Sequence, residues 1–257
     1  MKDGEIIRLD YTIWYVENGK EEIYDTTLEQ VAKDNGIHDP NKRYAPEVII
    51  LGKNMILEEL EKKIRESEIN KEYDLYLEPA QAYGERKPEL LKIHSWKEFD
   101  RNKIVPEVGK YITLNGNRGK VVSVSPGRIL VDYNHPLAGK KIHYKYIIRE
   151  IVDGIENKTR AMIELGYNKD IDKFKINIYD DKMEIIVPDS CKYGGDWTLA
   201  KFYIIGFIRD FFDKPINIVE IYNPPEKKEE NEKKPEETKV ENQEEKKPEE
   251  KAEENKN

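Results

Sequence analysis

Apolar and polar side chains alternate along several short segments of the first 85 residues, and this pattern predicts β-strands. Within residues 6–15, Ile7, Leu9 and Tyr11 fall on one face of such a strand. The Asn-Gly pair at positions 18–19 is typical of a hairpin turn. We therefore expect an antiparallel arrangement, with further strands at residues 21–27, 46–51 and 73–77.

One segment of this region has helical rather than β periodicity. Leu57, Leu60 and Ile64 are spaced three and four residues apart, so they form one apolar stripe along a helix. Asn54 precedes the stripe and is a suitable N-cap residue. The sequence predicts a short amphipathic helix that begins after Asn54. Residues 28–46 are polar and form a long excursion before this part of the chain.

A loop and a strand follow much later in the chain. Residues 134–140 read Asn-His-Pro-Leu-Ala-Gly-Lys, which is a loop signal that ends in a turn of small residues. In the next segment Ile142, Tyr144 and Tyr146 share one face of an alternating pattern. This pattern predicts a strand that enters a sheet directly from the turn.

The interval between these two regions has an organisation of its own. Three short β-patterns lie at residues 109–113, 120–125 and 129–133, separated by Gly-containing turns. We expect a small all-β unit inserted at residues 86–133. The alternative is a long decorated loop without a binding role, although a structureless loop of this length would be unusual.

Residues 153–224 predict a small α+β domain. Two β-patterns at 174–179 and 182–187 form a hairpin, and a last strand is predicted at 216–222. The helix predicted at residues 198–213 is apolar around most of its circumference, which requires burial on more than one side. We therefore expect this domain to form a homodimer. The alternative is that the hairpin and the last strand cover the whole helix.

The composition changes abruptly after the Pro-Pro pair at 224–225. Residues 226–257 hold 13 Glu and 9 Lys and very few apolar side chains. Such a segment cannot bury enough surface to offset its loss of conformational entropy. Residues 225–257 are therefore predicted to be a disordered tail.

Composition and charge narrow the classes of function. The net charge of −8 argues against a dedicated nucleic-acid-binding protein. No segment approaches the roughly 20 apolar residues of a membrane span. The single cysteine, Cys191, cannot form an internal disulfide, and the four histidines show no metal-ligand spacing. We expect a cytoplasmic protein without a metal or another cofactor.

Several short motifs occur in an order that resembles a known family. An aromatic-Asp pair at 24–25, a Leu-Gly pair at 51–52 leading into the helix, and Ala-Tyr-Gly at 82–84 precede the loop and closing strand after residue 134. Together they resemble the FKBP-type peptidyl-prolyl cis-trans isomerases, and more closely their SlyD-like branch. The resemblance covers about residues 5–84 and 134–152.

The resemblance implies an α+β fold class. Residues 1–85 and 134–152 would form the FKBP catalytic domain, an antiparallel sheet wrapped on a short helix. Residues 86–133 would form the insert-in-flap chaperone domain, which binds unfolded chains, and residues 153–224 would be a C-terminal α+β domain.

The resemblance also implies a pocket for the substrate proline. Asp25 would face the twisting amide or hold Tyr11 by a hydrogen bond. The hydroxyl of Tyr83 would donate to the substrate carbonyl, and Ile56 would contact the substrate through its backbone N–H. Leu60 would form the floor, where many FKBPs have Trp. The complete set of expected pocket residues is Tyr11, Tyr24, Asp25, Ile56, Leu57, Leu60, Tyr83, Leu137 and Tyr144.

Each of these tyrosines could instead be an ordinary half-buried strand residue, because Tyr is common in strands. Glu47 aligns with a pocket aromatic of the family, but Pro46 beside it leaves the register open, so Glu47 is not included.

Two functions of different class follow. The first is an isomerase that accelerates the folding of proline-containing polypeptides, with chaperone activity from the insert. The second is a non-catalytic holdase whose pocket has no catalytic role.

Overall fold

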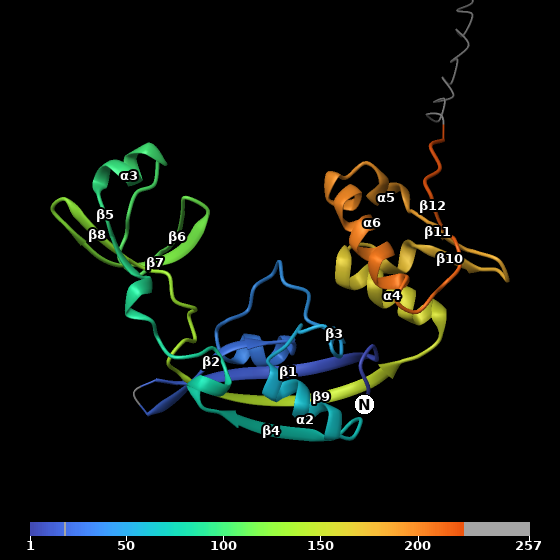
Figure 1. Cartoon of the computed structure of the whole chain (residues 1–257), viewed down its shortest axis with the longest axis horizontal. Coiled ribbons are helices and arrows are strands. Elements are labelled where there is room, and N and C mark those ends of the chain that lie inside the picture. The colour runs from blue at the N-terminus through green and yellow to red at the C-terminus, as the bar shows by residue number, and fades with distance from the viewer. Residues whose placement is uncertain (18, 224–257) are drawn as a thin grey trace, which may run out of the picture. The chain divides into compact units, whose positions relative to one another are not determined.

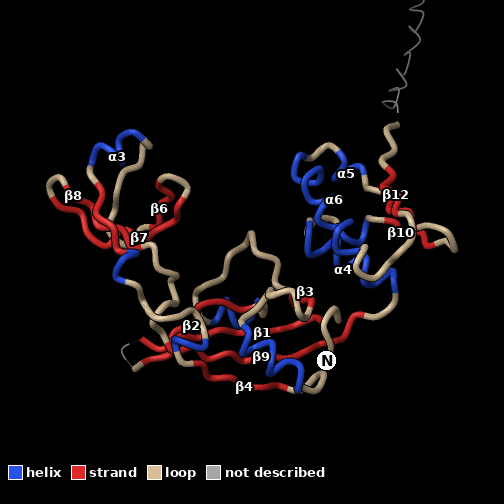
Figure 2. The backbone as a smooth tube through the Cα atoms, viewed as in Figure 1, coloured by secondary structure: helices blue, strands red, loops and turns tan. Residues whose placement is uncertain are grey.

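A computed structural model of the chain describes residues 1–17 and 19–223, and it has an α+β fold (Figures 1 and 2). The predicted tail at 225–257 and one residue of the predicted hairpin turn, Asn18, lie outside the described residues. The described residues form three separate β-sheets, and the predicted α+β fold class is confirmed.

The first sheet is built around two long antiparallel strands, β1 (Ile6–Glu17) and β9 (Lys141–Val152). Its strand order is β2-β1-β9-β4, with β3 also paired to β1. Every pairing is antiparallel, as the alternating pattern predicts. The remaining strands of this sheet are β2 (Lys20–Thr26), β3 (Glu47–Ile50) and β4 (Glu72–Leu77).

Helix α2 (Glu58–Glu66) buries Leu60 and Ile64 in the core of the first sheet. The prediction that this helix begins after Asn54 is wrong. Asn54 has a φ of 53°, in the left-handed region, whereas an N-cap residue is usually extended. The chain turns once more before the helix begins, with Leu57 at the N-cap position.

Two short elements in the same part of the chain as the first sheet were not predicted. Helix α1 (Glu29–Asp34) lies in the polar excursion and buries only Ala32, so it has no apolar stripe that the sequence pattern could reveal. A single 3-10 turn, η1 (Pro79–Gln81), follows β4 and leads into the Ala-Tyr-Gly motif.

The insert is a folded unit rather than a structureless loop. Its four-stranded sheet has the order β5-β8-β7-β6, and Phe99 from the small helix α3 is fully buried in a core of its own. A capping box between Ser95 and Glu98 begins this helix. The strand β5 was not predicted because it is only four residues long and its apolar side chains, Leu91 and Ile93, are exposed rather than buried. The elements are η2 (Pro88–Leu90), β5 (Leu91–His94), α3 (Trp96–Arg101), β6 (Tyr111–Leu114), β7 (Asn117–Ser125) and β8 (Arg128–Asp132).

The C-terminal part holds a three-stranded sheet of order β10-β11-β12 packed against helices. The parallel pairing of β11 with β12 requires a crossover, which contains helix α6. The elements are α4 (Ile155–Gly166), η3 (Ile171–Lys173), β10 (Lys175–Ile178), β11 (Met183–Ile186), α5 (Asp189–Lys192), α6 (Gly195–Ile208) and β12 (Ile216–Val219). Helix α4 was not predicted.

Helix α6 differs from the predicted helix at 198–213. It begins earlier, where the Asp196 carboxylate accepts a hydrogen bond from the Trp197 N–H, and it ends at Ile208. Its buried face carries Trp197, Ala200, Ile204 and Ile208. The alternative that the whole helix is covered is wrong for the described residues, because Leu199, Phe202 and Tyr203 are 68%, 67% and 69% exposed.

The C-terminal part and the first sheet share one hydrophobic core. Ile6, Val48, Ile50 and Val152 from the first sheet belong to the same buried cluster as Trp197. Strand β9 runs directly into α4 after a short turn, so the two parts are also continuous in the chain (Figure 1).

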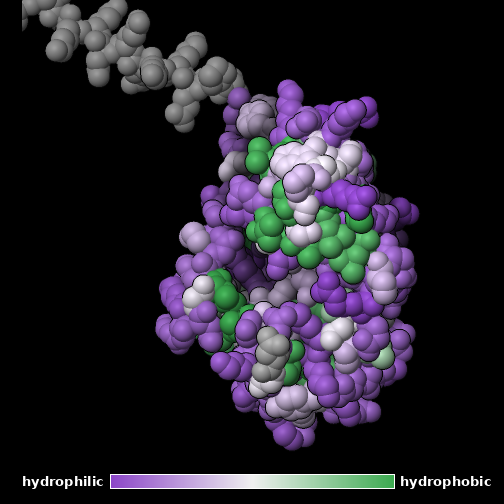
Figure 3. All heavy atoms as spheres, turned by 90° about the vertical axis from the view of Figure 1, so that its left-hand side faces the viewer, coloured by the Kyte–Doolittle hydropathy of each residue, from purple (hydrophilic) through white to green (hydrophobic). Residues whose placement is uncertain are grey.

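Hydrophobic surface is also present on the insert. Figure 3 shows the side of the molecule that carries the insert, and hydrophobic side chains, coloured green, gather in the upper part of this view. The most exposed apolar residues of the insert are Ile93, Val105 and Val108, which are 64%, 77% and 64% exposed. A patch of this kind is typical of a surface that binds other polypeptides.

Candidate active site

Eight of the nine residues predicted for the pocket line one cavity of about 420 Å³ beside helix α2. The cavity volume lies within the usual range for ligand sites. The eight residues are Tyr11, Tyr24, Asp25, Ile56, Leu57, Leu60, Tyr83 and Tyr144.

Strand register brings these side chains together. Ile13 on β1 pairs with Asp25 on β2 and with Tyr144 on β9, so one position of the central strand lies between two pocket residues. Tyr11 lies two residues before Ile13 and therefore on the same face of β1. The sheet thus forms one wall of the cavity, and Leu60 from α2 helps to form another.

Tyr11 is held by two carboxylates. Its hydroxyl donates toward Glu47 Oε1 at 2.9 Å and toward Asp25 Oδ2 at 3.3 Å. Burial raises the pKa of Tyr11 far above its ordinary value, and the negative charges of Glu47 and Asp25 raise it further. Tyr11 therefore remains a neutral phenol, and the shorter distance makes Glu47 its better acceptor.

Asp25 has partners beyond Tyr11. Its Oδ1 accepts hydrogen bonds from the Lys42 ammonium and from the Thr26 N–H. Because its side chain is still about one-third exposed, the carboxylate remains accessible from the cavity. Both roles that the sequence left open for Asp25 are compatible with these contacts.

A second pair of phenols lies at the other end of the cavity. The hydroxyls of Tyr83 and Tyr144 are 3.0 Å apart, so one donates to the other and one proton remains for a ligand. Burial, with the nearby Tyr83, raises the pKa of Tyr144 well above its ordinary value. The ring of His135 stacks on Tyr83 with centroids 4.2 Å apart, which fixes the position of that phenol.

The loop before α2 provides a backbone donor. The Ile56 N–H makes no hydrogen bond to any other residue in the described part of the chain. Ile56 itself lines the cavity and is half-buried. The amide is therefore available to a carbonyl oxygen of a bound peptide, which is the role expected for it.

Leu137 is the predicted pocket residue that the structure does not bring to this cavity. It is 1% exposed and lies in the core of the first sheet, because the turn after Pro136 directs it inward. Its N–H donates to His135 Nδ1 at 3.2 Å. Leu137 therefore lies behind the His135 ring that stacks on Tyr83.

Five lining residues were absent from the predicted set. Leu9 and Ile13 could have been found from the sequence, since they alternate with Tyr11 on one face of β1. Glu47 could be assigned to the cavity only with the register of β3, and its pairing with Leu9 gives that register. The other two, Asn54 and Met55, lie on a loop whose left-handed turn has no clear sequence signal.

The described residues, 1–17 and 19–223, contain no group of three His, Cys, Asp or Glu side chains placed to hold a metal ion. Within the same residues, no helix has the length and apolar character needed to cross a bilayer.

The cavity and its surroundings define a class of protein. A cavity with apolar side chains, phenols, one free backbone amide and the carboxylates of Asp25 and Glu47 can bind a peptide by an apolar ring and an adjoining carbonyl. The folded insert and the C-terminal part add two further units to this peptide-binding sheet.

Comparison with known proteins agrees with this class. Residues 92–137 match the family model described as "FKBP26, IF domain", and residues 155–223 match "FKBP26_C-terminal". The chain is 28% identical over 151 residues to the short-type peptidyl-prolyl cis-trans isomerase of Methanocaldococcus jannaschii, covering 59% of this chain and 94% of that one. It is 28% identical over 138 residues to the FKBP-type 16 kDa peptidyl-prolyl cis-trans isomerase of Escherichia coli, covering 51% and 86%.

A further relative is SlyD of Treponema pallidum, 30% identical over 119 residues, covering 44% of this chain and 66% of that one. The chain belongs to the FKBP-type peptidyl-prolyl cis-trans isomerase family and is a long, SlyD-like member with an insert-in-flap unit.

The Tyr83 hydroxyl provides a first test of the site. Tyr83→Phe should lower kcat/KM for a short proline peptide about two- to fivefold, because one hydrogen bond contributes about 0.5–1 kcal/mol. The His135 stack and the ring itself are retained in this variant. Tyr76→Phe is the matched control, since Tyr76 is 67% exposed and does not line the cavity. Equal rates for Tyr83→Phe and the wild type would remove Tyr83 from the site.

Proposed function

We propose that this chain catalyses cis-trans isomerisation of peptide bonds that precede proline in unfolded or partly folded polypeptides. The observation that carries the proposal is the single cavity that brings together Tyr11, Asp25, Tyr83 and Tyr144. The family to which the chain belongs supports the same activity, since its relatives are named as peptidyl-prolyl cis-trans isomerases.

The chemistry needs no bond cleavage. Rotation about the amide is slow because it removes the resonance of the planar bond, at a cost of about 18–20 kcal/mol. The planar amide is the more polar form, so transfer into a water-poor cavity disfavours it relative to the twisted form. Half-buried and buried phenols that stay neutral give the cavity this character without adding charge.

Hydrogen bonds would orient the peptide during rotation. The Ile56 N–H and the free proton of the Tyr83–Tyr144 pair are two donors available at the cavity. Together they can hold carbonyl oxygens of the peptide while the prolyl ring rests against Leu60 and the aromatic walls. Positioning of this kind lowers the entropic part of the barrier.

We assign polypeptide capture to the insert, residues 86–133. Its exposed Ile93, Val105 and Val108 offer apolar surface to an unfolded chain. Capture there raises the effective concentration of prolyl bonds at the cavity. We also propose that residues 1–85 and 134–152 form the catalytic unit and that residues 153–224 form a C-terminal unit. We propose a cytoplasmic location, since the single cysteine, Cys191, gives no sign of an oxidising compartment.

The alternative is a holdase that binds unfolded chains without catalysis. The carboxylate and hydroxyl contacts around Tyr11 and Tyr144 favour the enzyme, because binding of apolar chains alone does not require them. Exchange NMR on a short proline peptide with substoichiometric protein separates the two functions. An accelerated exchange rate supports the enzyme, and an unchanged rate supports the holdase.

We also propose a homodimer through the C-terminal unit. Leu199, Phe202 and Tyr203 form an outward apolar face on α6, and each is about two-thirds exposed. Burial of such side chains against a second copy would be favourable by about 1.5–3 kcal/mol for each fully buried side chain.

Native mass spectrometry at micromolar concentration tests the homodimer. The double variant Leu199→Glu and Phe202→Glu should be monomeric, whereas Tyr76→Glu, at an equally exposed aromatic residue of the first sheet, should remain dimeric. A wild-type protein that is entirely monomeric at this concentration ends the dimer proposal.

A further inference from the structure

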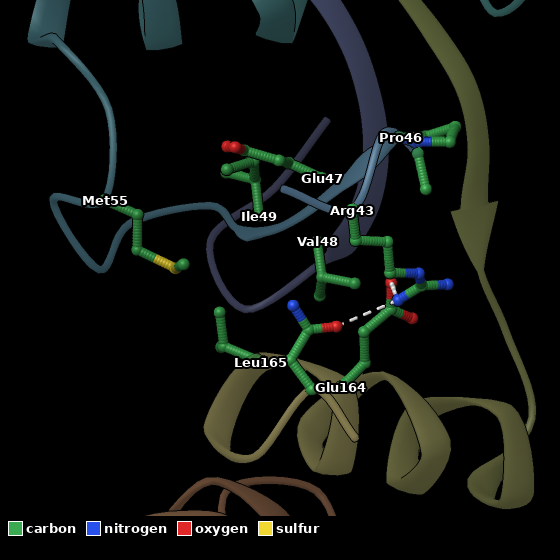
Figure 4. A pocket seen from close by; sticks show the side chains of 10 residues that line it. Arg43, Pro46, Glu47, Val48, Ile49, Met55, Glu164 and Leu165 are labelled. Atoms are coloured by element: carbon green, nitrogen blue, oxygen red, sulfur yellow. Dashed lines mark hydrogen bonds and ion pairs between the residues drawn. The ribbon is translucent and has the colours of Figure 1, made fainter. Parts of the chain in front are cut away.

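A second cavity of about 340 Å³ lies where the first sheet meets helix α4 (Figure 4). Val48 and Ile49 come from β3, Met55 from the loop that follows it, and Leu165 from α4 on the opposite side. Six of its lining residues are apolar, namely Ala45, Pro46, Val48, Ile49, Met55 and Leu165. The cavity is therefore suited to an apolar side chain rather than to a charged ligand.

The polar end of this cavity is a fixed ion-pair network. Glu164 on α4, whose side chain is only 10% exposed, receives Arg8 and Arg43 on its two carboxylate oxygens, each at 2.7 Å. Arg43 also donates to Asn168 Oδ1 at 3.0 Å. Because Glu164 is already paired by two arginines, the network leaves no uncompensated buried carboxylate for a cationic ligand. The half-exposed Arg43 guanidinium retains donors that can reach a peptide carbonyl.

The second cavity adjoins the cavity of the candidate active site, which we call the prolyl cavity. Glu47 and Met55 line both, so these two side chains form a shared wall. A peptide in extended conformation advances about 3.3–3.6 Å per residue, and the residues next to a bound proline would therefore reach the second cavity. Met55 in this wall packs against both the core of the first sheet and the core that the sheet shares with α4.

We propose that the second cavity is a subsite for the substrate polypeptide, and that it takes an apolar side chain within a few residues of the isomerised proline. This inference rests on the proposed function and adds a specificity determinant built in part by the C-terminal unit. The apolar lining selects the side chain, and Arg43 donates to a carbonyl of the same peptide segment. The FKBP sheet alone cannot form this subsite, because Glu164, Leu165 and Asn168 belong to α4 and the turn after it.

Peptide binding and turnover test the subsite in the full chain. Three labelled peptides are compared. The first is a tetrapeptide with one proline, and the other two are the same tetrapeptide with three leucines added at its N-terminal end or at its C-terminal end. Fluorescence anisotropy gives Kd, and exchange NMR gives kcat/KM. For the wild type, one of the two extensions should lower Kd about five- to tenfold, since one apolar side chain becomes buried.

Two variants locate that gain. Ala45→Phe fills the cavity from its half-buried rim and should abolish the gain while leaving tetrapeptide kcat/KM within about twofold. Arg43→Ala should reduce the gain about threefold. Arg43 is half-exposed, and Glu164 keeps its ion pair with Arg8 in this variant. Lys175→Ala, on the exposed surface of β10, is the matched control.

The outcomes are separable. If neither extension improves binding, or if the gain is the same in the wild type, Ala45→Phe and Arg43→Ala, the subsite is refuted even when tetrapeptide turnover is normal. If tetrapeptide turnover is absent but extension still improves Kd and Ala45→Phe removes the improvement, the subsite stands and the proposed catalysis fails.

Discussion

Asp25→Ala is expected to lower kcat/KM for a short proline peptide about tenfold, which corresponds to about 1.4 kcal/mol of transition-state stabilisation. Rotation of the amide withdraws negative charge from the carbonyl oxygen, so a carboxylate that faces the cavity favours the rotated form over the planar one. The substitution also leaves the Lys42 ammonium without its partner at the cavity edge. Exchange NMR at saturating and subsaturating peptide concentrations measures this change in kcat/KM.

Three controls separate the possible roles of Asp25. Tyr11→Phe should cost only two- to fivefold, about the value of one hydrogen bond, because Tyr11 has Glu47 as its closer acceptor. Lys42→Ala should stay within about twofold of the wild type, since Lys42 does not line the cavity. Asp25→Asn keeps the shape and removes the charge, and it should match Asp25→Ala.

A correctly folded Asp25→Ala protein, with an unchanged thermal unfolding midpoint and wild-type turnover, would contradict the assignment. If Asp25→Ala and Tyr11→Phe lose the same activity and the double variant loses no more, Asp25 acts only by positioning Tyr11.

Deletion of residues 86–133 is expected to separate peptide turnover from folding catalysis. The two ends of the insert already meet, because the Lys87 N–H donates to Asn134 Oδ1 at 2.8 Å. A short Gly-Ser linker can therefore replace the insert without strain on the first sheet. Turnover of a tetrapeptide should change by no more than about twofold, since the insert contributes no residue to the prolyl cavity.

Catalysis of proline-limited protein refolding should fall much further, by about 100-fold, because the deletion removes the gain from effective concentration. The measurement is the catalysed refolding rate of a reduced, carboxymethylated protein whose slow phase is a prolyl isomerisation. A holdase would instead show no peptide turnover before or after the deletion. Equal refolding catalysis with and without the insert would contradict the capture role proposed for it.

The strands were the most predictable part of the fold, for a physical reason. Alternation in residues 6–15 reflects the geometry of a strand, and β1 lies where that pattern places it. Ile7 and Leu9 face the core of the first sheet, whereas Ile6, on the opposite face, belongs to the core shared with the C-terminal part. Helix α4 was not predicted although it is long, because its buried face mixes the polar Thr159 and Glu164 with Met162, so it has no purely apolar stripe. Helix α1 could not have been found by periodicity, since its only buried residue is Ala32.

Pocket residues could be predicted where the family motif and the face of the strand both indicated the same side chain. Tyr11, Tyr24 and Tyr144 lie on strands whose register carries them to one cavity. Leu137 does not line this cavity, because a turn residue next to a proline can point either to the cavity or to the core, and in this chain it packs in the core. The Lys42 contact with Asp25 connects two segments whose proximity depends on the excursion at 28–46, which carries no local signal.

The cavity at α4 shows a second limit of prediction. The pairing of Glu164 with Arg8 and Arg43 joins residues more than 120 positions apart in the chain. Such contacts appear only when the C-terminal unit docks on the first sheet, so no local sequence pattern anticipates them.

The most direct test of the account is exchange NMR of a proline tetrapeptide combined with intermolecular NOEs to the full-length protein. We predict faster cis-trans exchange at substoichiometric protein, with NOEs from the prolyl ring protons to the ring of Tyr144 and the methyl groups of Leu60. Unaccelerated exchange, or prolyl contacts confined to the insert at residues 86–133, would contradict it.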